Sequence, residues 1–440
     1  MALGGGTWTR QNKVLPGTYI NFSSASKASA GISDRGIVAI PFSLSWGPEK
    51  DVFELNVENI ESDCISILGY LYSAPEMQTI REVFKHARTV FAYRLNVDTV
   101  KASNIYAVAK YGGTRGNDIK ISIAENLDTP TLFDVITYLD NQQVDKQTVE
   151  TAEELKSNSY VVFKDDITLV SDLGVSLENG TDGTGITGDD YQNFLNAVES
   201  YSFNILGCPT DDTDITRLFI AYTKRLCNDL GANFQLVCYR PENADSEVVI
   251  GLENAVVSAD GTNPEYGLIY WLAGAQAGCD LGSSLTNMQY DGEYEINLAY
   301  TQAELSEGIK AGKFLFHKVN GAAKVLADVN TYISFTERKG VDFQQNQTMR
   351  ILSALANDSA LLFNTKYLGI MPNDADGRVS LWNDLVTLYQ EYEKLHAIEG
   401  FEPESLKVVA GDTKKSVLCT AEALNIVNAM EQLYLNIIMV

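Results

Sequence analysis

The chain has 440 residues, and 45% of them are hydrophobic, so it can build the cores of about two to four domains. Its 58 acidic and 33 basic residues give a formal net charge of −25. This excess argues against nucleic acid and anionic membranes as partners, because both are bound by clustered Lys and Arg side chains. The six cysteines have no zinc-ribbon or C-x-x-C spacing, so we expect buried, reduced thiols.

No segment of the sequence predicts export or membrane insertion. The N-terminus has no apolar region of the kind found in a secretory signal. The most apolar stretch, residues 266–279, is shorter than the ~20 residues that a membrane-spanning helix needs. We therefore expect a protein that is made in a cytoplasm and remains soluble there.

The first residues, 1–26, have the composition of an arm rather than of a core. Within them, Tyr19, Ile20, Asn21 and Phe22 alternate in polarity, which predicts a strand with Ile20 and Phe22 on one face. No adjacent hairpin pattern offers this strand a partner. A frayed terminus is the alternative interpretation.

An α/β pattern begins in residues 27–97 and is then interrupted. The apolar run 36–41 and residues 89–95 predict strands, and residues 78–87 have apolar positions at helical spacing. Residues 98–178 instead predict a separate β-rich insertion, because short strand patterns recur there between turns. The strand patterns are 105–109, 119–123, 132–138 and 160–163, and the main turn is 111–118.

The α/β pattern resumes in residues 179–331. Residues 203–208 and 234–239 predict strands, and a helix is expected before each of them. This succession predicts a parallel sheet with helices on its faces. The apolar positions expected on the helices are Tyr191, Phe194, Leu195 and Val198 on the first, and Ile215, Leu218, Phe219, Tyr222, Leu226 and Leu230 on the second.

The last block, residues 332–440, predicts two helices and a terminal strand. The helices cover residues 344–363 and 380–397, the second with a stripe that ends at His396. Residues 433–440 are almost entirely apolar on both faces of a strand, so we expect this strand to be covered on both sides.

Catalytic signatures are missing from the sequence. No G-x-S-x-G nucleophile elbow and no phosphate-binding G-x-x-x-x-G-K-[ST] loop occurs. His86 lies in a cationic run, His317 follows an apolar strand pattern, and His396 lies on a helix stripe, so none is expected to act as a base. A hydrolase built on the α/β region remains an alternative, and it would need a reactive serine close to one of these histidines.

Two acidic loops are candidate cation sites. Asp182, Asp189 and Asp190 are hard oxygen ligands that could hold calcium, and a solvated turn is the alternative. Residues 373–377 resemble part of an EF-hand loop, but Pro372 and Asn383 occupy the positions that need carboxylates. We expect a polar turn there, with Gly377 at a positive φ. No cofactor and no metal is predicted.

The two chain ends are the most informative feature. An apolar strand without a partner tends to pair with another chain. Two such strands in each subunit would let every copy complete a sheet in its neighbours. Contacts of this kind, repeated head to tail, produce rings or open helical tubes.

A series of short motifs resembles the tail sheath proteins of contractile phage tails and related phage-tail-like bacteriocins. The likeness is closest to the sheath type of Gram-positive phages and defective prophages, and it covers nearly the whole chain. The most specific stretch is residues 272–278, followed by 284–287 (Ser-Leu-Thr-Asn) and 290–293 (Tyr-Asp-Gly-Glu). The other motifs are, in chain order, 16–19, 35–41, 46–48, 111–118, 180–183, 329–332, 335–336, 343–347, 372–374 and 376–378.

The resemblance implies a structural protein and not an enzyme. Subunits of this family stack as six-fold rings around an inner tail tube, and on a trigger from the baseplate the sheath shortens and drives the tube through a cell envelope. The implied partners are further copies of the chain, the tail tube protein, and baseplate and tail-terminator proteins. The implied location is a virion tail or phage-tail-like particle that is assembled in the host bacterial cytoplasm. A non-contractile shell or surface-layer protein is the alternative.

In this family the terminal arms add strands to neighbouring subunits. The corresponding residues here are Tyr19, Ile20, Asn21, Phe22, Leu433, Tyr434, Leu435, Asn436, Ile437, Ile438, Met439 and Val440. The implied fold is multidomain α/β, with a discontinuous α/β sheath domain, an inserted β-rich domain, an α+β C-terminal domain and extended strand arms. The expected boundaries are 1–26 (N-terminal arm), 27–97 (first part of the α/β core), 98–178 (β-rich domain), 179–331 (central α/β domain), 332–428 (C-terminal domain) and 429–440 (C-terminal arm).

Overall fold

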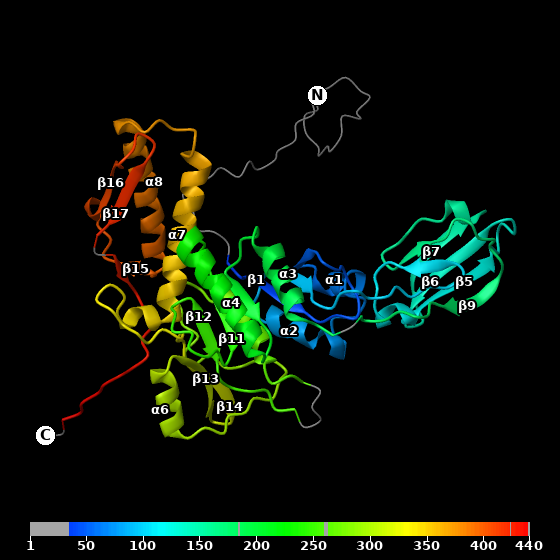
Figure 1. Ribbon diagram of the computed structural model, residues 1–440, viewed down its shortest axis with the longest axis horizontal. Helices are drawn as coiled ribbons and strands as arrows, with labels where there is room; N and C mark the ends of the chain where they lie inside the picture. The colour runs from blue at the N-terminus through cyan, green and yellow to red at the C-terminus, as the bar shows by residue number, and fades with distance from the viewer. Residues whose placement is uncertain (1–34, 184, 259–262, 423, 439–440) are drawn as a thin grey trace, which may run out of the picture. The chain divides into compact units, whose positions relative to one another are not determined.

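The computed structural model describes residues 35–183, 185–258, 263–422 and 424–438 (Figure 1). These residues form two compact units. The smaller one consists of residues 354–425, and the larger one of residues 35–353 together with 426–438. The strand predicted at residues 19–22 and the last two residues, Met439 and Val440, lie outside the described chain.

An eight-stranded sheet forms the centre of the larger unit. The six inner strands run parallel, and the two edge strands, β2 and β14, run antiparallel to their neighbours. The predicted parallel sheet is confirmed, with Ile205 opposite Gln235 where β10 meets β11. The strand order is β14 (Ala322–Ala327), β13 (Lys313–Val319), β12 (Val249–Leu252), β11 (Gln235–Tyr239), β10 (Ile205–Cys208), β1 (Ile37–Phe42), β3 (Thr89–Arg94) and β2 (Val52–Asn56).

Helices cover both faces of this sheet. Successive strand residues point to opposite faces, and accordingly Val38 packs with α5 (Leu268–Gly278) while Ala39 packs with α3 (Gly188–Val198) and α4 (Thr213–Arg225). The helix positions expected from residues 191–198 are all buried. Leu230 is an exception that we predicted wrongly: it is 64% exposed, because α4 ends at Arg225 and continues as a π-helical turn, Leu226–Leu230.

Helix α5 is buried on every side, which explains why it is the most apolar stretch of the chain. It lies between the sheet and α2 (Gln78–Phe84). A Cβ atom at Gly274 would lie 2.2 Å from the Val83 carbonyl oxygen, so glycine permits the close approach of these two helices. In the described chain, no helix has both the length and the apolar character that a membrane crossing requires.

The expected β-rich region is present in residues 107–176. It contains a four-stranded antiparallel sheet and a separate pair of short strands around their own apolar core. We did not predict β7 and β9, because their residues are mostly polar or exposed and carry little apolar alternation. The strands are β7 (Gln142–Val149), β6 (Phe133–Leu139), β5 (Ile119–Glu125) and β9 (Asp172–Ser176), with β4 (Ala107–Ala109) paired to β8 (Val161–Phe163).

The turn at residues 111–118 fastens this region to the end of β3. Arg94 has no exposed surface and donates hydrogen bonds to the carbonyl oxygens of Gly47 and Gly112 at 3.2 and 2.8 Å. Gly113 has a φ of 133°, and a Cβ atom there would lie 1.9 Å from the Ser45 carbonyl oxygen. A side chain at this position would force the turn away from the core.

The smaller unit contains two long helices and a hairpin. α7 (Asn346–Lys366) begins in the larger unit and continues into this one, and α8 (Ala375–Lys394) follows. α8 ends before His396, which is exposed with a φ of 56°, so our assignment of His396 to a helix stripe was wrong. The remaining helices and strands of the molecule are α1 (Ile60–Ser66), α6 (Gln302–Lys310), β15 (Ile398–Glu399), β16 (Leu406–Ala410), β17 (Val417–Ala421) and β18 (Asn425–Ile426).

Gly377 also differs from the expectation, since it is not in a positive-φ turn. It lies in the first turn of α8, where its N–H donates to the carboxylate of the N-cap residue Asp374 at 2.8 Å. A Cβ atom on Gly377 would lie 2.1 Å from the Pro372 carbonyl oxygen. Close packing of the cap, and not a left-handed backbone, therefore accounts for this glycine.

Candidate assembly site

The C-terminal segment is an apolar tail without a partner in the described chain. Residues 432–438 form neither helix nor strand there, and make no backbone hydrogen bond with the other described residues. Figure 1 shows this tail, in red, extending away from its unit. The exposed fractions are 86% for Leu433, 88% for Tyr434, 72% for Leu435, 75% for Ile437 and 81% for Ile438.

The sequence led us to expect a strand covered on both sides at this position. A lone extended segment cannot satisfy its own backbone groups by β pairing, so within one chain the strand does not form. Contiguous exposed apolar side chains of this size mark a surface that another molecule covers. The assignment of residues 433–440 as a linking strand stays a prediction.

The hairpin of β16 and β17 offers unpaired strand edges. The two strands pair with each other from Leu406 opposite Ala421 to Ala410 opposite Val417. Neither pairs with a third strand among the residues that the structure describes. The outer edges therefore leave backbone N–H and C=O groups open for an added strand, except at Leu406, whose carbonyl oxygen accepts a hydrogen bond of 2.9 Å from Trp382 Nε1.

An apolar groove of about 410 Å³ lies beside this hairpin, within the smaller unit. α7 and α8 form its other walls. Its lining includes Phe363, Leu385, Tyr389, Val417 and Cys419. The groove has room for apolar side chains, and it runs along a hairpin that can accept a strand.

His86 and His317 are partly buried within the larger unit, whereas His396 is exposed. His86 Nε2 lies 3.1 Å from Asp291 Oδ1, and the same oxygen accepts a hydrogen bond of 2.7 Å from Trp271 Nε1. Burial would raise the pKa of Asp291, but the hydrogen bonds from Trp271 and His86 bring the pKa below its usual value. Burial, together with Lys324, lowers the pKa of His317 on β13. The Asp291 contact orients the His86 ring beside Trp271 of α5.

Of the three candidate calcium ligands, Asp182 and Asp190 have structural roles, and Asp189 is exposed in the first turn of α3. The Asp182 carboxylate accepts 2.8 Å hydrogen bonds from the backbone N–H and the hydroxyl of Thr114. Asp190 caps α3, where its carboxylate accepts from the N–H and the hydroxyl of Thr187, each at 2.8 Å. Across the described residues, no group of three or more His, Cys, Asp or Glu side chains is arranged to hold a metal ion.

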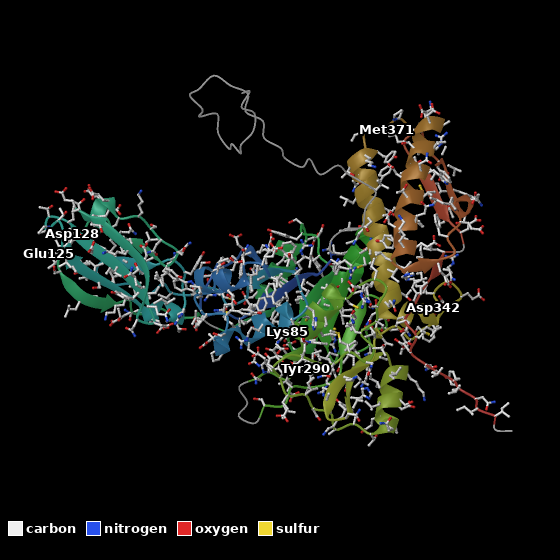
Figure 2. The ribbon with its side chains drawn as sticks, turned by 180° about the vertical axis from the view of Figure 1, so that it is seen from behind. Lys85, Glu125, Asp128, Tyr290, Asp342 and Met371 are labelled. Carbon is white, nitrogen blue, oxygen red and sulfur yellow. The ribbon has the colours of Figure 1, made fainter. Side chains whose placement is uncertain are left out.

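The motif at residues 290–293 is hydrogen-bonded to Glu82 of α2. Tyr290 donates its hydroxyl to Glu82 Oε2 at 2.8 Å, and the N–H of Glu293 donates to Glu82 Oε1. Figure 2 labels Tyr290 and Lys85, which mark the two sides of this contact. Glu82 is fully buried, and burial raises its pKa to about 7. A Cβ atom on Gly292 would lie 2.3 Å from Glu82 Oε2, so the glycine is needed for this contact.

Sequence reasoning missed the side chains that hold the base of the tail. Gln347 is buried and bonds to Val427 and Ala429, and Thr286 bonds to Glu431. These partners lie 80 to 145 positions apart in the sequence, so no local periodicity could reveal them. The only signal was that Thr286 and Gln347 lie in motifs that carry the family resemblance.

Four family models match consecutive parts of the chain. They are the Gp18 domain III N-terminal region of tail sheath proteins over residues 35–95, and the phage tail sheath protein beta-sandwich domain over residues 89–182. The phage tail sheath protein central domain matches residues 184–331, and the phage tail sheath C-terminal domain matches residues 338–439.

Individual proteins match over nearly the full length. The phage-like element PBSX protein XkdK of Bacillus subtilis is 32% identical, with 99% of each chain covered. The sheath tail protein DSY3957 of Desulfitobacterium hafniense is 36% identical, with a TM-score of 0.77 and coverage of 90% of this chain and 93% of that one. A chain of the contracted anti-feeding prophage helical sheath has the same fold, with a TM-score of 0.55, 11% identity and coverage of 97% of this chain and 99% of that one.

Proposed function

The chain belongs to the phage tail sheath protein family, and on that premise we propose that it is the structural subunit of a contractile tail sheath. In this proposal, copies polymerise as stacked six-fold rings around an inner tube, and the polymer contracts to drive the tube through a target cell envelope. The partners are other copies of the chain, the tube protein, and baseplate and terminator proteins. The particle is a phage tail or a prophage-derived tail, assembled in the bacterial host.

The exposed tail is the observation that carries this proposal. It provides a donor with unpaired backbone groups and large apolar side chains, and the β16–β17 hairpin provides open edges beside an apolar groove. Addition of the tail of one copy to the hairpin of another would pair the backbone of both and cover apolar surface on both. Residues 19–22 are proposed as a second donor strand.

The net charge of −25 constrains how such a polymer is held together. Like charges accumulate as copies are added, so net electrostatic attraction cannot drive the assembly. Strand pairing and apolar burial must therefore provide most of the association energy, with local charge complementarity at individual contacts. The contracted sheath chain that shares the fold supports contraction as the working cycle of this proposal.

Deletion of residues 433–440 tests the proposal. We expect the shortened chain to remain soluble, because the apolar side chains described in this segment, up to Ile438, are exposed and contribute little to the core. We expect it to lose polymer formation, because the donor strand is gone. Electron microscopy and sedimentation of the purified full-length and shortened chains measure this difference.

Two results would contradict the proposal. The first is that the shortened chain builds tubes at the same concentration as the full-length chain. The second is that tubes of the full-length chain keep one diameter under every triggering condition, which would favour a non-contractile shell. A matched control replaces Asn436 by Ser, which keeps the length and the apolar faces of the tail, and should assemble normally.

A further inference from the structure

We infer that residues 427–431 are a fixed root, and that the specific residues holding it set the position and direction from which the donor strand leaves the subunit. This inference rests on the proposed function and deepens it by naming the positioning residues. The tail root is defined here as residues 427–431, and the free tail as residues 432–438. All of the contacts that follow lie within the larger unit.

Gln347, in the first turn of α7, bonds to the start of the root through both the oxygen and the nitrogen of its side-chain amide. Its Oε1 accepts a hydrogen bond of 2.9 Å from the Ala429 N–H, and its Nε2 donates to the Val427 carbonyl oxygen at 3.3 Å. The same Nε2 lies 3.3 Å from the Leu281 carbonyl oxygen. Gln347 is only 3% exposed, so these bonds form away from competing water.

The end of the root is held by a second contact, to the motif at residues 284–287. The Thr286 hydroxyl donates to Glu431 Oε1 at 2.6 Å, and the Ser284 hydroxyl lies 3.2 Å from the same oxygen. Among the residues described up to Ile438, Glu431 is therefore the last one that bonds to the rest of the unit. The next residue, Gln432, bonds only within the tail, where it accepts a hydrogen bond from the Tyr434 hydroxyl.

The groups that hold the root are themselves fixed by a buried ion pair. Thr286 Oγ1 accepts a 3.0 Å hydrogen bond from the Asp328 backbone N–H, and the Leu285 N–H donates to the Asp328 carboxylate at 3.1 Å. Arg350, one turn after Gln347 on α7, pairs with that carboxylate at 3.1 Å, and both side chains are 1% exposed. The buried pair therefore orders the Thr286 contact, and Asn346, the residue before Gln347, donates to the same carboxylate at 2.9 Å.

The arrangement separates two roles in consecutive residues. The root bonds to its own subunit through polar side chains, while the free tail carries the apolar side chains that a neighbour would cover. A donor strand that starts from a fixed point samples fewer orientations than one on a loose linker, so less entropy is lost when it docks. Two of the motifs that carry the family resemblance, 284–287 and 343–347, thereby have a physical role, since they contain residues that hold the root.

Hydrogen exchange and polymerisation, measured on the full-length chain, test this inference. In Gln347→Ala we expect the Ala429 backbone amide, which loses its acceptor, to exchange faster by roughly three- to tenfold, with slower polymerisation. In Glu431→Ala, which removes the acceptor of the Thr286 hydroxyl, we expect slower polymerisation. Glu431→Gln keeps an acceptor oxygen and should restore the rate of polymerisation. Gln432→Ala, one residue further along, is the matched control and should behave as the unchanged chain.

The outcomes separate the inference from the proposed function. Gln347 is buried, so its replacement could also disturb the fold. The Glu431→Ala substitution is the check, because Glu431 is exposed and its removal leaves no cavity in the core. If exchange of the Ala429 amide is unchanged in Gln347→Ala, or if polymerisation keeps its normal rate in both Gln347→Ala and Glu431→Ala, the inference is wrong. If the chain lacking residues 433–440 still polymerises, the proposed function itself fails.

Discussion

Two buried carboxylates, Asp328 and Glu82, hold neighbouring parts of the stretch between α5 and α6, and they differ in what balances their charge. Asp328 receives the guanidinium of Arg350 as well as amide donors. Glu82 receives a hydroxyl and a backbone N–H, while the adjacent Arg81 bonds to Glu293 instead. Hydrogen bonds alone do not offset the loss of hydration at Glu82, since its pKa rises to about 7.

A carboxylate with a buried cation can stay ionised away from water, but it becomes dependent on that cation. A carboxylate with neutral donors depends on no single partner, but its ionisation opposes folding. Three experiments test this difference, from the largest expected effect to the smallest.

Replacement of Arg350 by Leu should have the largest effect. It leaves the Asp328 charge buried without a cation, which typically costs about 3–5 kcal/mol of the free energy of unfolding. Urea unfolding, at a protein concentration below that at which the chain polymerises, measures the loss. The double variant Arg350→Leu/Asp328→Asn removes the uncompensated charge and should recover a large part of the stability. If the Arg350→Leu chain were as stable as the unchanged chain, Arg350 would not be what balances the charge of Asp328.

Replacement of Glu82 by Gln should change the pH dependence of stability. Folding raises the pKa of Glu82 from 4.5 to about 7, so between these pH values the carboxyl is protonated in the folded state and ionised in the unfolded state. The contribution of this group to the stability of the folded state is complete below pH 4.5. It is lost as the pH rises through 7, by about 3 kcal/mol in total.

We expect Glu82→Gln to flatten this part of the stability profile, because an amide does not titrate. Unfolding experiments at several pH values from 4 to 8 measure the slope, with Glu76→Gln, at an exposed position before the same helix, as the control. An unchanged slope in Glu82→Gln would mean that Glu82 is ionised across this range in the folded state.

Replacement of Arg217 by Ala should have the smallest effect. Arg217 pairs with Asp214 and Glu242 at 2.9 Å, but all three side chains are more than half exposed. Exposed ion pairs contribute about 0–1 kcal/mol, because water and salt screen them. We expect a change in the free energy of unfolding below about 0.5 kcal/mol. A loss comparable to that of Arg350→Leu would contradict the role we assign to burial.

The parallel sheet and its helices could be predicted because they depend on local pattern. β10 and β11 are continuous apolar runs, and the buried face of α3 follows helical spacing. The position of β1 between β10 and β3 could not be predicted, since it is set by pairing across more than 160 residues. β7 was missed because a polar, exposed strand lacks the apolar alternation on which such predictions depend.

The candidate assembly site likewise has one part that could be predicted from the sequence and one part that could not. The apolar tail is visible in the sequence as a run that no local partner covers. Its root is not visible, because Gln347, Thr286 and Glu431 are ordinary polar residues until the fold brings them together. The open edges of β16 and β17 likewise depend on what the rest of the chain leaves unpaired.

The described apolar side chains of the tail lie close to the root along the chain, which has a mechanical consequence. Residues 432–438 are seven residues, and even fully stretched they span only about 24 Å at roughly 3.4 Å per residue. In the proposed polymer this segment acts as a tether of limited length between the root and a neighbour that covers those side chains. Joined subunits could turn and slide past one another within that radius, but any greater separation would have to break the strand or release its root.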